Sequence, residues 1–267
     1  MPSVAGGSAV TPTGRWNMCG NGLHGSAPET FPRPQTFAVL PAFKYYILMN
    51  LKNLLAAITL IMATTATSAL ADSIRLPQPD IKGDLTVGEA LRQRRSVREY
   101  DSKKQLSDQE ISNLLWAAAG INRPADGKRT NPTALNTQEI DLYLFMADGV
   151  YLYDFKNNSL DKRVSGDHRA LVAGNKEFSQ DFVLDAPVSV VIVAETSRYE
   201  MQGPRVTLMS MADAGIVSQN INLFCAATGL ATVTRATMDA DGIRALLGLP
   251  ATAIPAINNP VGYEVVH

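Results

Sequence analysis

Three arginines and a serine stand within five consecutive positions, Arg94-Arg95-Ser96-Val97-Arg98. Guanidinium groups are forked, charge-assisted donors and the serine hydroxyl adds another, so the set suits a phosphate monoester. If the chain is extended here, Arg94, Ser96 and Arg98 share one face, because side chains alternate along a strand. The same residues could instead form a solvated basic helix end, where cations interact favourably with the helix dipole. The segment alone leaves both interpretations open.

Other reactive side chains are scarce. The chain has two cysteines, Cys19 and Cys225, and three histidines, His24, His168 and His267. Neither cysteine belongs to a CxxC pair, so neither a zinc site nor a disulfide framework is indicated. Cys225 lies in an apolar stretch and is expected to be a small buried hydrophobe. The sequence offers no Ser-His-Asp set and no convincing pair of carboxylates.

The composition is that of a soluble globular protein, with 46% hydrophobic residues, 18% charged residues and a net charge of -1. A broad nucleic-acid surface would need an excess of Lys and Arg, so the charge balance argues against one. A local basic cluster could still hold an anionic ligand.

The first third of the chain is expected to lie outside the folded domain. Residues 1–48 are rich in Gly, Pro, Ser and Thr and are interpreted as a disordered or misassigned extension. Residues 49–71 have a basic start, an apolar run of about ten residues and an Ala-Leu-Ala end, the pattern of a cleaved signal peptide. The run is too short for a membrane anchor, and no Cys follows it as in a lipoprotein. We therefore expect export to the bacterial periplasm or beyond, a linker at 72–84 and one domain at 85–267.

The domain mixes helices and strands. Thr86-x-x-Glu89 and Ser107-x-x-Glu110 have the form of capping boxes. The first opens a short helix ending near Arg94, and the second opens a helix with apolar residues at helical spacing from Ile111 to Ala118. A long helix is expected over 204–228, ended by Gly229, and another follows Asp239 up to Leu247. Strands are expected at 139–147, 149–155, 186–195 and 231–236 and in the C-terminal tail, with a hairpin turn at Asp148-Gly149. This order predicts an α+β, three-layer domain.

Four blocks carry a family resemblance. Residues 94–120, RRSVREYDSKKQLSDQEISNLLWAAAG, resemble the opening of the nitroreductase family, and residues 129–138, RTNPTALNTQ, its next loop. GVYLYD at 149–154 is similar to a hairpin of the short SagB-like branch, and residues 212–233 resemble the long helix of the family's dimer interface. The resemblance covers about 85 to 264 and implies a homodimer, a mainly antiparallel sheet flanked by helices, and FMN bound at the interface.

The resemblance also implies site residues. Arg94, Arg95, Ser96 and Arg98 would hold the FMN phosphate. Pro132, Thr133 and Asn136 would lie by the pyrimidine edge of the flavin, although such residues also favour ordinary turns. Thr234, Arg235 and Ala236 would pass the flavin near N5, largely through backbone groups, or form a structural strand end. Gln219 and Asn220 are expected to be buried polar groups paired across a dimer.

The implied activity is ping-pong reduction of a small molecule such as a nitroaromatic or quinone. No catalytic side chain and no metal is assigned. Two departures stand out: Gly262-Tyr263 is followed by Glu264 without a basic residue, and no Glu-Gly pair stands at 236–237. Two alternatives stay open: a SagB-like azoline dehydrogenase, and a non-catalytic flavin-binding or electron-carrier protein.

Overall fold

A computed structural model describes residues 73–81 and 85–266, which all lie in one compact unit, Met62–His267. The extension expected at 1–48 and the signal peptide expected at 49–71 lie outside the described residues. Among the residues that are described, no helix combines the length and apolarity that crossing a bilayer requires.

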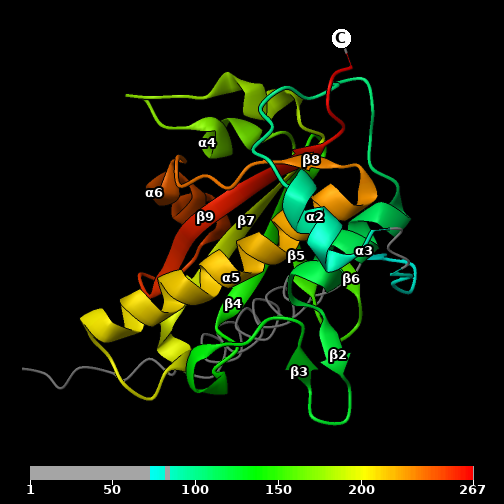
Figure 1. Ribbon diagram of the computed structural model, residues 1–267. Helices are drawn as coiled ribbons and strands as arrows, with labels where there is room; N and C mark the ends of the chain where they lie inside the picture. The colour runs from blue at the N-terminus through cyan, green and yellow to red at the C-terminus, as the bar shows by residue number, and fades with distance from the viewer. Residues whose placement is uncertain (1–72, 82–84, 267) are drawn as a thin grey trace, which may run out of the picture. The chain divides into compact units, whose positions relative to one another are not determined.

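The centre of the domain is a seven-stranded sheet in the order β1-β6-β5-β4-β7-β9-β8 (Figure 1). Every pair of neighbouring strands is antiparallel. The strands are β1 (Ser73–Arg75), β4 (Ile140–Met146), β5 (Gly149–Asp154), β6 (Ser159–Ser165), β7 (Val188–Glu195), β8 (Ala231–Thr232) and β9 (Ala253–Gly262). A separate hairpin consists of β2 (Ile121–Arg123) and β3 (Lys128–Arg129). The antiparallel α+β class is therefore confirmed.

Four of the described helices begin and end near the expected signals, whereas α4 was not predicted. They are α2 (Val87–Gln93), α3 (Asp108–Ala119), α4 (Arg169–Ala173), α5 (Pro204–Thr228) and α6 (Ala240–Leu247). Thr86 and Ser107 both form complete capping boxes with the glutamate three residues on. Gly229 and Gly248 end α5 and α6 at positive φ, which glycine adopts without a Cβ clash.

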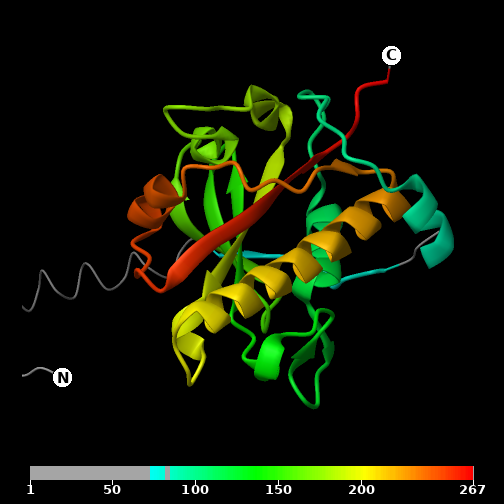
Figure 2. The same ribbon diagram turned by 60° about the vertical axis from the view of Figure 1, so that its left-hand side comes forward.

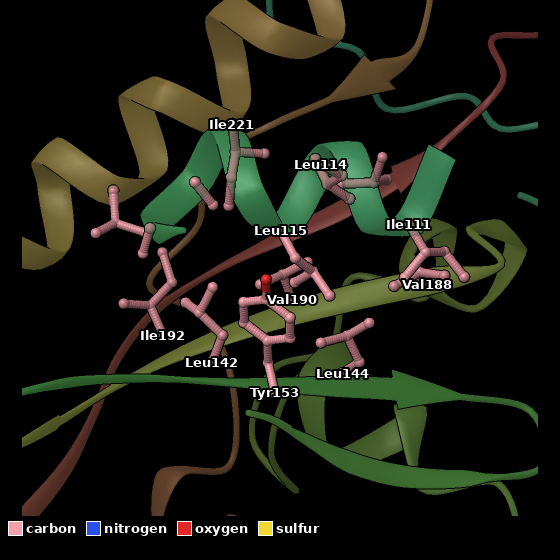
Figure 3. Close-up of a cluster of buried hydrophobic side chains, with 14 of the residues drawn as sticks. Ile111, Leu114, Leu115, Leu142, Leu144, Tyr153, Val188, Val190, Ile192 and Ile221 are labelled. Atoms are coloured by element: carbon pink, nitrogen blue, oxygen red, sulfur yellow. The ribbon is translucent and has the colours of Figure 1, made fainter. Parts of the chain in front are cut away.

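Helices cover both faces of the sheet. Alternate residues of β4 and β7 point to opposite sides, so Leu142 and Ile192 pack under α3 and α5 while Tyr143 and Val193 pack under α4 and α6. Figure 3 shows side chains of α3 and α5 meeting those of the strands in the first of these layers. Figures 1 and 2 both show α5 running along β9. The three-layer expectation is thus confirmed.

Several segments differ from the sequence-based expectation, and the β2–β3 hairpin is one that was not predicted. Residues 73–81 were expected to be part of a linker, but Ser73–Arg75 form the edge strand β1 and Leu76 is buried in the core. The carbonyl of Pro77 accepts hydrogen bonds from Ser112 and Asn158, which ties this segment to α3. Strand β6 was not predicted, because its polar run from Asp161 to Arg163 hides the buried Leu160.

The hairpin between β4 and β5 also differs by one position. Its turn residues are Ala147 and Asp148, and Gly149 already pairs with Met146 as the first residue of β5. A Cβ at Gly149 would lie 2.7 Å from the carbonyl oxygen of Val164. Close approach of β6, rather than the turn, therefore requires this glycine.

The cap of α3 gives a test of the fold. Replacing Ser107 by Ala removes both side-chain hydrogen bonds that Ser107 forms with Glu110. We expect unfolding to become easier by about 1 kcal/mol in urea denaturation. The matched control is Ser102→Ala, an exposed serine, which should change the unfolding free energy by less than about 0.5 kcal/mol. Equal effects of the two substitutions would contradict the capping assignment.

Candidate functional site

The arginine-rich segment leaves α2 as extended chain. Helix α2 ends at Gln93, and the backbone N–H of Val97 donates to the carbonyl of Thr232 at 3.0 Å. Val97 is buried in a cluster with Tyr100 and Ala231, whereas Arg95, Ser96 and Arg98 are exposed and Arg94 is half-buried. The segment is therefore an extended stretch held beside the start of β8 by a buried valine.

Of the four polar residues in the segment, Arg95 lies apart from Arg94, Ser96 and Arg98. Arg95 and Val97 line one small cavity of about 140 Å³, which Arg94, Ser96 and Arg98 do not line. Among the described residues, the side chains of Arg94, Ser96 and Arg98 make no hydrogen bond or ion pair. The expectation that these three share one face agrees with this division.

The side chain of Arg95 forms an ion pair within the protein. Its guanidinium lies 2.5 Å from a carboxylate oxygen of Glu264, the residue that follows Gly262-Tyr263. Glu264 is itself held by a β-bridge with Tyr100. The glutamate that departs from the family pattern thus neutralises one of the four residues expected at the phosphate.

The 231–237 segment runs beside the arginines, and its residues alternate between buried and exposed from Val233 to Ala236. Thr234 and Ala236 are exposed, while Arg235 is 6% exposed. The guanidinium of Arg235 donates to the carbonyls of Val172 and Ala173 at the end of α4, and also to side-chain oxygens of Gln180 and Asn258.

The backbone of Arg235 is also occupied, since its N–H and carbonyl pair with Asn258 at 2.9 and 2.7 Å. Arg235 was expected to face a ligand largely through backbone groups. Its polar groups instead bond to the protein, so its contribution is to anchor the segment that exposes Thr234 and Ala236.

A buried polar network supports the same segment. The side chain of Asn259 accepts from Ser218 at 2.7 Å and donates to Thr232 at 3.2 Å. The hydroxyl of Ser218 lies 2.6 Å from that of Thr234, which also accepts from Asn222 at 2.8 Å. The conformation of the segment is thus fixed from α5 and β9 together.

Sequence reasoning missed this network. The available signal was two consecutive amides, Asn258 and Asn259, in an otherwise apolar strand, and both are fully buried. Within one chain, Gln219 on α5 is exposed, and Asn220 is half-buried and donates to the carbonyl of Ala118; their expected pairing across a dimer stays a prediction.

The third expected group lies apart from the first two. Pro132 and Asn136 are exposed and Thr133 is half-buried, in a loop that contains the short 3-10 helix η1 (Ala134–Asn136). Figures 1 and 2 both place this loop on the opposite side of α5 from the 231–237 segment. Within one chain, the structure brings 94–98 and 234–236 together and leaves 132–136 separate.

This loop has an unusual backbone. Leu135, Asn136 and Gln138 all have φ near +50°, which is unfavourable for a residue with a Cβ. Leu135 is 74% exposed, so packing of its own side chain does not account for the conformation. Backbone strain of this kind gathers at functional sites, where surrounding contacts maintain it.

One reactive residue, Cys225, is buried as the sequence predicts, and one arrangement is an exception. Cys225 is buried in α5, and burial raises the pKa of its thiol. Within residues 73–81 and 85–266, no group of three or more His, Cys, Asp or Glu side chains could hold a metal ion. The exception is a buried pair of carboxyl groups, Glu139 and Asp213, which the sequence did not indicate.

Comparison with known proteins agrees with the fold. The model of the Nitroreductase family matches residues 91–263. A protein of Methanocaldococcus jannaschii that carries the name of a nitroreductase is 31% identical over 207 residues, which are 73% of this chain and all of that protein.

Solved structures agree as well. A Ralstonia eutropha crystal structure, described as a nitroreductase, is 31% identical, with a TM-score of 0.67 over 74% of this chain and 91% of that one. A Staphylococcus epidermidis structure, described as an NAD(P)H:FMN oxidoreductase, has a TM-score of 0.53 over 71% of this chain and 92% of that one. At 11% identity the latter shows the fold alone. Because the family match spans the arginine segment, α5 and β9, the chain belongs to the nitroreductase family, a family of oxidoreductases.

Proposed function

We propose that the chain is an exported, FMN-dependent oxidoreductase of the nitroreductase type, which reduces nitroaromatics, quinones or similar small molecules. The observation that carries this proposal is the arginine edge, formed by the half-buried Arg94 and the exposed Ser96 and Arg98. It lies inside the family match and beside the exposed Thr234 and Ala236.

The charges at this edge fit a phosphate. Arg98 lies close enough to the buried guanidinium of Arg235 for the two cations to repel each other. In the described part of the chain, neither arginine forms an ion pair with a carboxylate. A phosphate dianion on Arg94 and Arg98 would relieve that repulsion and accept a further hydrogen bond from Ser96.

The chain's own residues would act mainly by positioning. Bound FMN would supply the hydride and electron transfer, and the protein would orient it and tune it. The backbone of Thr234 and Ala236 would lie along the flavin, fixed by the network around Asn259. Since no side-chain acid is assigned, we expect solvent to deliver protons, and donor and acceptor to use one site in turn.

We further propose that the site is completed in a homodimer. Pro132, Thr133 and Asn136 would then contact the flavin held by the arginine edge of the other subunit. Exposed apolar side chains on α5 and α2 support a partner surface: Leu208 is 71% exposed, Val87 72% and Leu91 55%. Light scattering should give a dimer for the native chain and a monomer for Leu208→Asp; a native monomer would contradict this part.

Export is proposed from residues 49–71 alone, which lie outside the described part of the chain. Cleavage would leave a mature protein beginning near Asp72. The periplasmic or secreted fraction of the native host should contain a chain with this N-terminus. A full-length chain, found only in the cytoplasm, would contradict export.

Two other functions remain as alternatives. A SagB-like azoline dehydrogenase would use FMN in the oxidative direction on a peptide, and such enzymes work beside cytoplasmic cyclodehydratases, which export would prevent. A flavin-binding electron carrier is favoured by export, since NAD(P)H is not expected outside the cytoplasm.

The arginine edge gives the first functional test. We expect Arg94→Ala/Arg98→Ala to weaken FMN binding roughly a hundredfold, because two charge-assisted contacts are lost. Quenching of flavin fluorescence on titration measures this affinity. Arg95→Ala is the matched control, since Arg95 pairs with Glu264 and should affect binding by less than about threefold. Equal losses in both proteins would contradict the phosphate assignment.

The reaction itself has a direct test. If the chain is a reductase of the nitroreductase type, NADH or NADPH should bleach the visible flavin absorption, and a nitroaromatic or quinone should then restore it. The two half-reactions should be separable by removing the donor between them. A flavoprotein that neither nucleotide reduces would favour the carrier, and one reduced only by an azoline-containing peptide would favour the dehydrogenase.

A further inference from the structure

Two carboxyl groups that are far apart in the sequence meet in the interior beside the strained loop. Glu139 precedes β4 and is fully buried, and Asp213 on α5 is 5% exposed. The Glu139 carboxyl lies within hydrogen-bonding reach of the Asp213 carboxyl. Two buried carboxylates in contact cannot both be ionised without a large electrostatic penalty.

The donors around the pair indicate where a proton is needed. Asp213 Oδ2 accepts from the backbone N–H of Ala134 at 2.7 Å and lies 3.5 Å from the hydroxyl of Tyr199. Glu139 Oε2 lies 2.8 Å from the hydroxyl of Thr137. Glu139 Oε1 is buried and has no partner. A proton held between the two carboxyl groups would satisfy this last oxygen.

The pair and its contacts lie on both sides of the strained residues. Ala134 precedes Leu135 and Asn136, Thr137 stands between Asn136 and Gln138, and Glu139 itself follows Gln138. Backbone conformations of this kind persist only where the surroundings fix the chain before and after them. The two carboxyl groups supply such fixed points from the residue before β4 and from α5.

We infer that Glu139 and Asp213 share one proton in a carboxyl–carboxylate hydrogen bond, and that this pair positions the loop 133–138. The proton is bound to one oxygen and accepted by the other carboxylate, which keeps a single negative charge. The role toward the cofactor rests on the proposed function, because Thr133 and Asn136 are the loop residues that would contact FMN. The shared proton itself does not depend on that function.

Few other charges face the pair. Among the described residues, the titratable neighbours are Arg129 from β3 and Tyr199 after η3 (Thr196–Arg198). Burial lowers the pKa of Arg129 to about 10, so it remains a cation at neutral pH. Arg198 and Asp141 form their own ion pair at 2.5 Å.

The sign of the pH dependence follows from these surroundings. Burial, reinforced by Asp213, raises the pKa of Glu139 above its unfolded value of about 4.3. The stability contributed by Glu139 is therefore complete below about pH 4.3 and is lost as pH rises through the raised pKa.

Isosteric variants test the shared proton. Glu139→Gln keeps a donor toward Asp213 that does not titrate, so its melting temperature relative to the native chain should rise steadily from pH 4.5 to 8.5. Glu177→Gln, which removes an exposed carboxylate, is the control and should show a constant difference. A constant difference for Glu139→Gln as well would overturn the inference.

Infrared spectroscopy on the native chain tests the proton even if a variant does not fold. At neutral pH we expect the carbonyl stretch of one protonated carboxylic acid, which should be absent from Glu139→Gln where that variant folds. A native spectrum at neutral pH with ionised carboxylates alone would overturn the shared proton.

FMN affinity tests the positioning role. Glu139→Ala should weaken binding about tenfold, and Glu139→Gln should restore affinity to within about twofold of native. Equal affinity of the Ala and native chains would refute the positioning role. A native chain that binds no FMN would instead refute the proposed function, while the melting and infrared results still decide the proton.

Discussion

Burial of α5 against β7 and β9 constrains the rest of this domain. Its apolar side, with Val217 and Ile221, packs on the sheet, but the same helix also buries the polar side chains of Asp213 and Ser218. Buried polar groups must be paired, because an unpaired one loses its hydration without compensation. Each therefore takes a partner from an irregular segment, which is held in place by that bond.

The two bonds hold different parts of the proposed site. Ser218, with Asn259 from β9, fixes Thr234 beside the arginine edge, whereas Asp213 fixes Ala134 in the strained loop. One helix thus sets the position of both segments, although they lie on opposite sides of it (Figures 1 and 2). A change in the packing of α5 would therefore alter the positions of both segments.

The arginines illustrate how burial divides similar residues between structure and binding. Arg95 is neutralised by Glu264, and Arg235 is surrounded by carbonyl and amide oxygens. The side chains of Arg94 and Arg98 have no such protein partners among the described residues. Unneutralised cations in a protein of net charge -1 are a more specific indication of an anion site than the arginine-rich motif itself.

Local signals predicted much of the fold, because they act over a few residues. The capping boxes at Thr86 and Ser107 and the glycine after α5 depend only on neighbouring positions, and they were correct. Strand β6 was missed because its pairing with β5 and β1, not its own composition, makes it a strand.

The candidate site was harder to predict, for the same reason. Nothing near Arg95 in the sequence indicates Glu264, which lies 169 positions away, and nothing near Glu139 indicates Asp213. The arginine edge itself could be proposed from alternation, since that needs only an extended backbone. Tertiary contacts determine which arginine side chains have no ion-pair partner within the described residues.

The most direct measurement of the central claim compares the affinities of FMN and riboflavin for the purified chain. The two ligands share the flavin ring and the ribityl chain and differ in the phosphate that Arg94, Ser96 and Arg98 would bind. FMN should bind roughly a hundredfold more tightly than riboflavin at low salt, and added salt should reduce this difference in affinity. Equal affinities would contradict a phosphate site at this edge.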